Sequence, residues 1–223
     1  MRLIVDAHMY YPNMMAWSCG RSRKLKSNIE QDYAKYLYST NKINEIINMH
    51  KENRRICLDI GFGAGDSIIQ TLMNGKSIVI GCEIFKPAIF HTLTRVEDKD
   101  RVFLCMAFIN DLIQSLPLNS FDEIKMLCPD PWPKYKHRMR RCYNIRKFDL
   151  EIVKILKKEG IFTLASDIKS ITQNMVNLFN SPYFDIAQNE YTTYDECPHK
   201  TEYCKKGFNA GRHVYEMIAR KSI

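Results

Sequence analysis

The stretch at residues 56–69, ICLDIGFGAGDSII, decides the fold of this chain. An apolar run of strand character leads into a turn with glycines at every second position, and a helical pattern follows directly. Glycine permits a tight turn and lets the backbone come close to a ligand. In open α/β sheets such turns lie at the carboxyl end of a strand, where ligands bind. We therefore expect a ligand-binding turn at residues 59–65.

Apolar runs alternate with helical segments along the rest of the chain, which implies crossover connections and parallel strands. We predict strands at 56–62, 77–84, 102–107, 123–128 and 160–166, then a closing antiparallel pair at 184–188 and 213–219. We predict helices at 66–74, 87–97, 109–115, 143–158 and 170–180. This order predicts an α/β, doubly wound fold with a seven-stranded, mostly parallel sheet and an antiparallel C-terminal strand pair.

The composition is that of a globular protein with an anionic partner. The chain has 223 residues, is 45% hydrophobic and 26% charged, and carries a formal net charge of +8. Its length suits one domain. We expect this single domain at 20–223, after a flexible leader at 1–19. No apolar run approaches the roughly 20 residues of a membrane helix, and we expect no membrane partner.

The cysteines indicate thiols rather than disulfides or a metal site. Four of the eight, Cys57, Cys82, Cys105 and Cys128, fall in predicted strands. Buried free thiols are typical of a reducing compartment, so we expect a cytoplasmic protein. Three further residues, Cys197, His199 and Cys204, match no zinc-ligand spacing, and we expect no metal.

The glycine turn fits a cationic ligand better than a dinucleotide. A dinucleotide fingerprint would place Gly or Ala at position 66, where this chain has Asp66, and no Walker sequence is present. The anionic Asp59 beside Gly61 and Gly63 disfavours a pyrophosphate and suits the ammonium and sulfonium of S-adenosylmethionine. Glu83 ends the second predicted strand, where an acid accepts hydrogen bonds from ribose hydroxyls.

A second motif, PDPWPKYKHRMRR at 129–141, follows the fourth predicted strand. Its prolines restrict the backbone around Asp130. From Lys134 to Lys147 there are seven Lys or Arg residues and no acid, close to Trp132. Cations beside aromatic rings are typical of sites that bind splayed-out RNA bases. Two further basic sets occur at 21–26 and at Lys200, Lys205, Lys206 and Arg212. A solvated charged face is the structural alternative.

From about residue 20 to its end the chain resembles the bacterial tRNA (guanine-N7)-methyltransferases. The segments that carry the resemblance are RSRKLKSNIEQ, LDIGFGAG, GCEIFKPAI, PLNSFDEIKMLCPDPWPKYKHRMRR, LASD and TEYCKKGFNAGRHVYEM. The resemblance implies a Rossmann-like class I methyltransferase. It also implies that S-adenosylmethionine donates a methyl group to N7 of a guanosine in the variable loop of tRNA.

Positions that match the family's motifs take the family's roles as expectations. The expected cofactor-binding residues are Asp59, Gly61, Gly63, Glu83, Ala107 and Asp130. Asp130 is also the expected catalytic residue. The expected substrate-binding residues are Lys134, Asp167, Thr201, Glu202, Tyr203 and Cys204.

The sequence departs from the family at two places. The Asp or Asn usual at the third strand end is Ala107, with Asn110 and Asp111 as nearby substitutes. The family's Thr-Lys-Phe-Glu motif falls on Thr201–Cys204, so its acid is replaced by Cys204. Two alternatives stay open: a non-catalytic RNA-binding module on this scaffold, and a methyltransferase for another nucleobase. The sequence also leaves open whether the protein is a monomer or a homodimer.

Overall fold

The computed structural model describes residues 34–132, 134, 136, 141, 143 and 147–222. The expected leader at 1–19 and the basic set at 21–26 lie outside these residues. The chain divides into two compact units, one up to Leu116 and one from Pro117 onward. That residues 20–223 form a single domain therefore stays a prediction.

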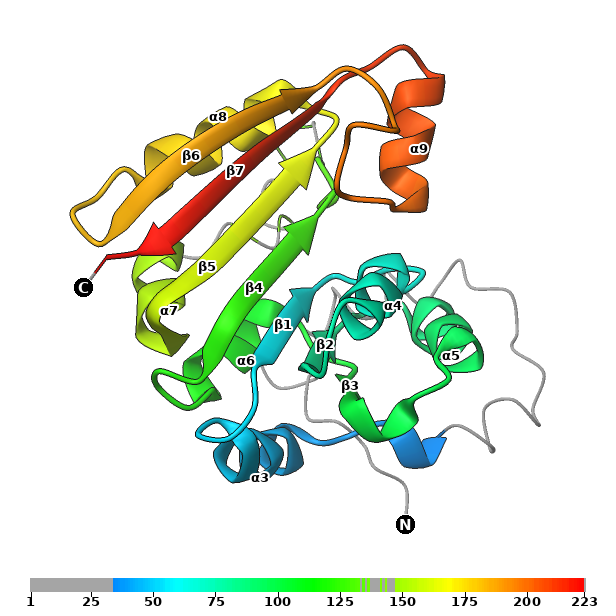
Figure 1. Cartoon of the computed structure of the whole chain (residues 1–223), viewed down its shortest axis with the longest axis vertical. Helices are drawn as coiled ribbons and strands as arrows, with labels where there is room; N and C mark the ends of the chain where they lie inside the picture. The colour runs from blue at the N-terminus through cyan, green and yellow to red at the C-terminus, as the bar shows by residue number, and fades with distance from the viewer. Residues whose placement is uncertain are drawn as a thin grey trace. The chain divides into compact units, whose positions relative to one another are not determined.

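The first unit contains three parallel strands in the order β3-β2-β1 (Figure 1). The strands are β1 (Ile56–Ile60), β2 (Ile78–Cys82) and β3 (Val102–Cys105). The helices are α3 (Thr40–His50), α4 (Asp66–Met73), α5 (Lys86–Arg95) and α6 (Ile109–Leu112), with 3₁₀ turns at Ala34–Tyr36, Lys99–Arg101 and Ile113–Ser115. All three strands and the helices that follow them were predicted, although each strand and α6 are two or three residues shorter than expected.

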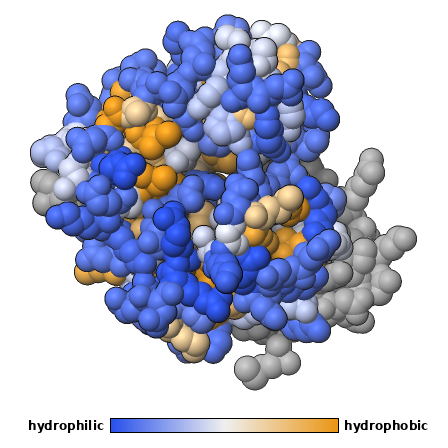
Figure 2. All heavy atoms as spheres, viewed as in Figure 1, coloured by the Kyte–Doolittle hydropathy of each residue, from blue (hydrophilic) through white to orange (hydrophobic). Residues whose placement is uncertain are grey.

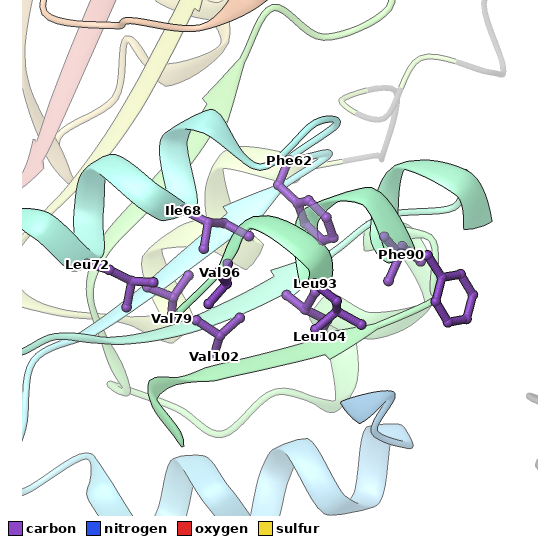
Figure 3. Packing of buried hydrophobic residues seen from close by; sticks show 10 residues of the cluster. Phe62, Ile68, Leu72, Val79, Phe90, Leu93, Val96, Val102 and Leu104 are labelled. Carbon is purple, nitrogen blue, oxygen red and sulfur yellow. The ribbon is translucent and has the colours of Figure 1, made fainter. Parts of the chain in front are cut away.

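Buried strands and amphipathic helices form the core of this unit. Every residue of β1 and β2 is buried, as parallel strands covered on both faces require. Ile68 and Leu72 of α4 and Leu93 of α5 pack with strand residues such as Val79 and Leu104 in one apolar cluster (Figure 3). This packing holds the carboxyl ends of the strands and the loops that follow them on a rigid base.

The second unit contains four strands in the order β4-β5-β7-β6. They are β4 (Phe121–Leu127), β5 (Leu156–Ser166), β6 (Phe184–Tyr191) and β7 (Val214–Lys221), with helices α7 (Phe148–Ile155), α8 (Lys169–Phe179) and α9 (Glu202–Asn209). β4 and β5 are parallel, whereas β7 is antiparallel to β5 and to β6. The predicted set of seven strands with an antiparallel C-terminal pair is confirmed.

Two elements of this unit differ from the prediction. In place of the helix predicted at 143–158 the structure has α7 at Phe148–Ile155. The helix ends earlier than predicted because the chain enters β5 at Leu156. Glu159 there has φ +62°, which breaks any helical continuation. The helix α9 was not predicted; its start is marked by Thr201, whose side chain accepts a hydrogen bond from Cys204 N.

Four phenylalanines form the centre of the second unit. Phe162 of β5 stacks on Phe179 of α8 with ring centroids 4.8 Å apart, and Phe148 and Phe184 pack against Phe179. These contacts fix α7 and α8 on the sheet. On the face drawn in Figure 2 most coloured residues are hydrophilic and the hydrophobic ones form small patches. Among the described residues no helix is long and apolar enough to cross a membrane.

Candidate active site

The glycine turn after β1 is a cradle with positive φ angles. The φ angles of Gly61, Gly63 and Gly65 are +68°, +54° and +82°. A Cβ on Gly65 would lie 2.5 Å from the Oγ1 atom of Thr92, so only glycine fits there. A Cβ on Gly61 would meet no described atom within 4 Å. The turn is therefore packed against Thr92 at Gly65, whereas the backbone at Gly61 has free space beside it. Such space lets a ligand approach the backbone closely.

Asp59 places a carboxylate beneath this turn. It is the fourth residue of β1 and is 1% exposed, and its carboxylate accepts a hydrogen bond from the hydroxyl of Ser67 in α4. Asp59 is therefore a buried group that joins β1 to α4 next to the turn, rather than a group open to solvent.

Glu83 joins the end of β2 to the glycine turn. Its Oε2 accepts a hydrogen bond from Gly63 N at 3.0 Å, and its Oε1 accepts from Ile84 N at 2.7 Å and Phe85 N at 2.9 Å. An ionised carboxylate has about four acceptor positions. Glu83 thus shapes the turn while it presents an acid at the strand end, where a ribose binds in this class of fold.

Asp66, which breaks the dinucleotide fingerprint, has a structural partner. Its carboxylate lies 2.7 Å from the guanidinium of Arg95 in α5, which also donates to Ala64 O at 2.5 Å. Arg95 therefore ties the end of the turn and the start of α4 to α5. This contact explains why an acid follows the glycines here.

The third strand end carries Ala107 two residues after β3, with Phe108 as the N-cap residue of α6. Both side chains are half-buried. The possible substitutes Asn110 and Asp111 lie in α6, and burial raises the pKa of the Asp111 carboxyl. That these residues cover the adenine of a cofactor stays a prediction.

In the second unit, Asp130 lies in a stiff and strained backbone segment. Cys128 and Trp132 have φ angles of +50° and +39°, a region that non-glycine residues rarely occupy. Arg141 donates from Nε to Pro131 O and from Nη2 to Trp132 O, both at 3.2 Å. This arginine of the basic run therefore supports the motif itself. Backbone strain of this kind is characteristic of functional sites.

The Asp130 side chain is exposed, yet surrounding protein atoms desolvate it in part and raise the pKa of its carboxyl. Lys134 and Lys136 are also exposed. The rest of the run at 133–146, apart from Arg141 and Tyr143, lies outside the described residues. The basic run as an RNA-binding segment stays a prediction.

Asp167 follows β5 and meets α9. Its Oδ2 accepts from Arg212 Nε at 2.9 Å and lies 2.8 Å from Arg212 Nη2. A Cβ on Gly207 of α9 would lie 2.8 Å from the Cβ of Asp167. The glycine therefore lets α9 pack closely against Asp167, the residue that follows β5.

The segment Thr201–Cys204 forms the start of α9, and only part of it is accessible. Thr201 and Cys204 are buried, whereas Glu202 and Tyr203 are exposed, Tyr203 by 56%. Lys206 Nζ lies over the Tyr203 ring, 5.3 Å from its centroid. Glu202 and Tyr203 are therefore accessible from solvent, whereas Thr201 caps the start of the helix and Cys204 packs beneath it.

Cys204 lies among thiols rather than in a polar site. Its Sγ is 3.5 Å from Cys128 Sγ, at the end of β4. The hydrogen bond with Cys128 and burial raise the pKa of the Cys204 thiol to about 12. The thiol is therefore neutral at physiological pH and does not replace the carboxylate that the family has here.

The expected site residues fall into two groups, one in each unit. Asp59, Gly61, Gly63 and Glu83 lie together around the glycine turn, and Asp130 and Asp167 follow parallel strands of the second unit. The sequence did not identify the supporting roles of Arg95 and Arg141. Among the described residues no group of three or more His, Cys, Asp and Glu could hold a metal ion; a metal-free protein stays a prediction.

The fold is shared with solved methyltransferases. An antibiotic-related methyltransferase aligns with a TM-score of 0.53 and 18% identity over 83% of this chain and 95% of that chain. The 16S rRNA (adenine(1408)-N(1))-methyltransferase of Catenulisporales acidiphilia aligns with a TM-score of 0.57 and 12% identity over 81% and 92%. At these identities the likeness shows the fold, which is Rossmann-like and of the class I type.

Sequence comparison narrows this class to a family. The family described as "Putative methyltransferase" matches residues 53–217. A bifunctional methyltransferase of Rickettsia conorii is 31% identical over 87% of this chain, which spans only 37% of that protein. The tRNA (guanine-N(7)-)-methyltransferase of Wolbachia pipientis wMel is 32% identical over 67% of this chain and 68% of its own length, and that of Francisella philomiragia is 28% identical over 91% of both. The chain belongs to this methyltransferase family, and its resemblance to the tRNA (guanine-N7)-methyltransferases is confirmed.

Proposed function

We propose that the protein transfers a methyl group from S-adenosylmethionine to N7 of a guanosine in tRNA, in the variable loop. The observation that carries the proposal is Asp130, held between two residues of positive φ at the end of β4. The relatives that the chain matches over most of their length are named tRNA (guanine-N(7)-)-methyltransferases.

The residues of the first unit fit the cofactor. The open backbone at Gly61, the carboxylate of Glu83 and the buried charge of Asp59 together suit an uncharged ribose and a cationic amino acid portion. When bound, S-adenosylmethionine supplies an electrophilic methyl group. Glu83 accepts hydrogen bonds from the ribose, Asp59 favours positive charge, and Ala107 with Phe108 covers the base.

The residues of the second unit act on the acceptor. Guanine N7 has an in-plane lone pair and carries no proton, so no side chain must remove one before transfer. The main task of the protein is to orient the base, a proximity effect. Asp130 accepts hydrogen bonds from the guanine edge and stabilises the positive charge that develops on the ring.

Asp167, Glu202 and Tyr203 complete the acceptor side. Asp167 is fixed by Arg212, and Tyr203 offers an exposed aromatic face next to a lysine. A ring in this setting stacks on an unpaired base. Lys134 and the basic residues after it contact phosphates, which position the tRNA without reading its sequence.

The test is a methylation assay with bulk tRNA and labelled S-adenosylmethionine, followed by nucleoside analysis of the product. We expect label in 7-methylguanosine, and its loss in Asp130→Ala. Asp122→Ala serves as the matched control, because Asp122 lies at the opposite end of β4 and pairs with Lys157 at 3.0 Å. Label in another nucleoside would favour a different acceptor base. Binding of tRNA without transfer would favour the non-catalytic alternative.

A further inference from the structure

The second unit contains a buried polar cluster that the proposed mechanism does not use. Its centre is Glu216 of β7, which is 3% exposed. Glu216 Oε1 lies 2.6 Å from His199 Nε2. Its Oε2 accepts from Asn189 Nδ2 and from the Tyr191 hydroxyl, both at 2.7 Å. Burial alone would raise the pKa of the Glu216 carboxyl, but these hydrogen bonds lower it, so Glu216 is ionised at neutral pH.

Stability alone does not account for a buried carboxylate at this position. Replacing a buried ionic group by an apolar side chain of similar volume is often neutral or stabilising. Such groups are retained in some proteins because they specify one conformation among several. Glu216 could act in this way on a segment whose conformation its hydrogen bonds determine.

The geometry points to the segment that starts α9. His199 is buried and stands two residues before Thr201, the N-cap residue of α9. In the sheet Glu216 pairs with Ala165 of β5, two residues before Asp167. On its other side it pairs with Asn189 of β6. The Glu216 carboxylate thus connects the antiparallel pair β6 and β7 to the loop that precedes Thr201, while its backbone pairs with the end of β5.

We propose that Glu216 is a positioning residue for the segment Thr201–Cys204. Its hydrogen bond with His199 fixes the loop that leads into Thr201, the first residue of this segment. It thereby sets where Glu202 and Tyr203 contact the guanine. The inference rests on the proposed function for its substrate, but its structural part does not depend on activity. Glu216 touches no reacting atom and acts through the loop at 199–201.

Lys221 provides a matched control at the other end of the same strand. It is also buried, and its Nζ donates to Asn119 Oδ1 at 3.0 Å and to the carbonyl oxygens of Val153 and Leu156 at 2.8 Å. Lys221→Met removes a buried charge from β7 without touching the α9 segment. It separates a general loss of stability from a local effect.

The first measurement is amide hydrogen exchange on the full chain, which reports local opening. In Glu216→Leu we expect exchange of residues 197–206 to be at least about tenfold faster, with β1–β3 unchanged. Lys221→Met should leave 197–206 as in the wild type. Wild-type exchange at 197–206 in Glu216→Leu would overturn the proposal, whether or not the protein methylates tRNA.

The second measurement is steady-state kinetics with tRNA. We expect Glu216→Leu to raise the KM for tRNA about tenfold or more, with cofactor affinity within about twofold of the wild type. Glu216→Gln keeps an acceptor and a donor in the same place and should restore most of the lost affinity. An equal rise in KM in Lys221→Met, or no rise in Glu216→Leu, would reject a positioning role.

A further variant covers the case in which Glu216→Leu fails to fold. His199→Ala changes a loop residue rather than a strand residue, and it removes the same hydrogen bond between His199 and Glu216. It should show the same faster exchange and higher KM, and wild-type values for it would also reject the proposal. A wild-type protein that methylates no tRNA would refute the proposed function alone, because the exchange result still decides the role of Glu216.

Discussion

Removing the carboxylate of Glu83 should damage both the glycine turn and cofactor binding. The link from Glu83 to Gly63 is partly buried and joins residues 20 apart in the sequence. A hydrogen bond to a charged group of this kind contributes roughly 1.5–3 kcal/mol. The two local bonds, to Ile84 N and Phe85 N, are replaced in part by water and contribute roughly 0.5 kcal/mol each. Glu83→Ala should therefore cost roughly 2.5–4 kcal/mol of unfolding free energy.

That loss corresponds to a melting temperature lower by roughly 5–16 °C for a protein of this size. Affinity for S-adenosylmethionine should fall by about tenfold or more, because the ribose contact and the shape of the turn are lost together. Calorimetry measures both quantities on one preparation. Glu97→Ala, at an exposed position just after α5, is the control. Unchanged melting and unchanged affinity in Glu83→Ala would refute the role given to this carboxylate.

Substitutions at three further positions, all in the second unit, test the remaining roles. Asp130→Ala should lower the single-turnover rate by something like 2–4 kcal/mol of barrier while the melting curve is kept. Because desolvation raises the pKa of Asp130, the wild-type rate should fall on the acid side at a higher pH than an ordinary aspartate predicts, and Asp130→Asn should remove this limb of the pH–rate profile. Gly207→Ala places a Cβ 2.8 Å from that of Asp167, so it should cost about 1–3 kcal/mol in a urea titration and raise the KM for tRNA. Cys204→Glu restores the acid of the family at a fully buried position, so it should lower stability by roughly 2–5 kcal/mol in the same titration, and a stable, more active variant would contradict this.

Much of the fold could be predicted from local patterns. Continuous apolar runs such as 56–60 and 78–82 became fully buried parallel strands. Glycines at 61, 63 and 65 adopt the positive φ angles that their spacing suggested. These features depend on residues close together in the chain, where glycine freedom and side-chain periodicity act directly. The short helix α9 escaped prediction because its eight residues are mostly polar and its packing depends on Gly207 against Asp167.

The sequence by itself determined the order of strands and helices, the glycine turn, and the acids at the strand ends, Asp59, Glu83 and Asp130. Only the tertiary structure decided which side chains are exposed to solvent and which are buried or bonded to other residues. Glu83 holds Gly63, Asp167 is paired with Arg212, and Cys204 is buried against Cys128. The physical reason is that burial and hydrogen bonding arise between residues 20 to 76 positions apart in the chain. Local sequence patterns contain no information on such distant partners, and the packed fold alone brings them together.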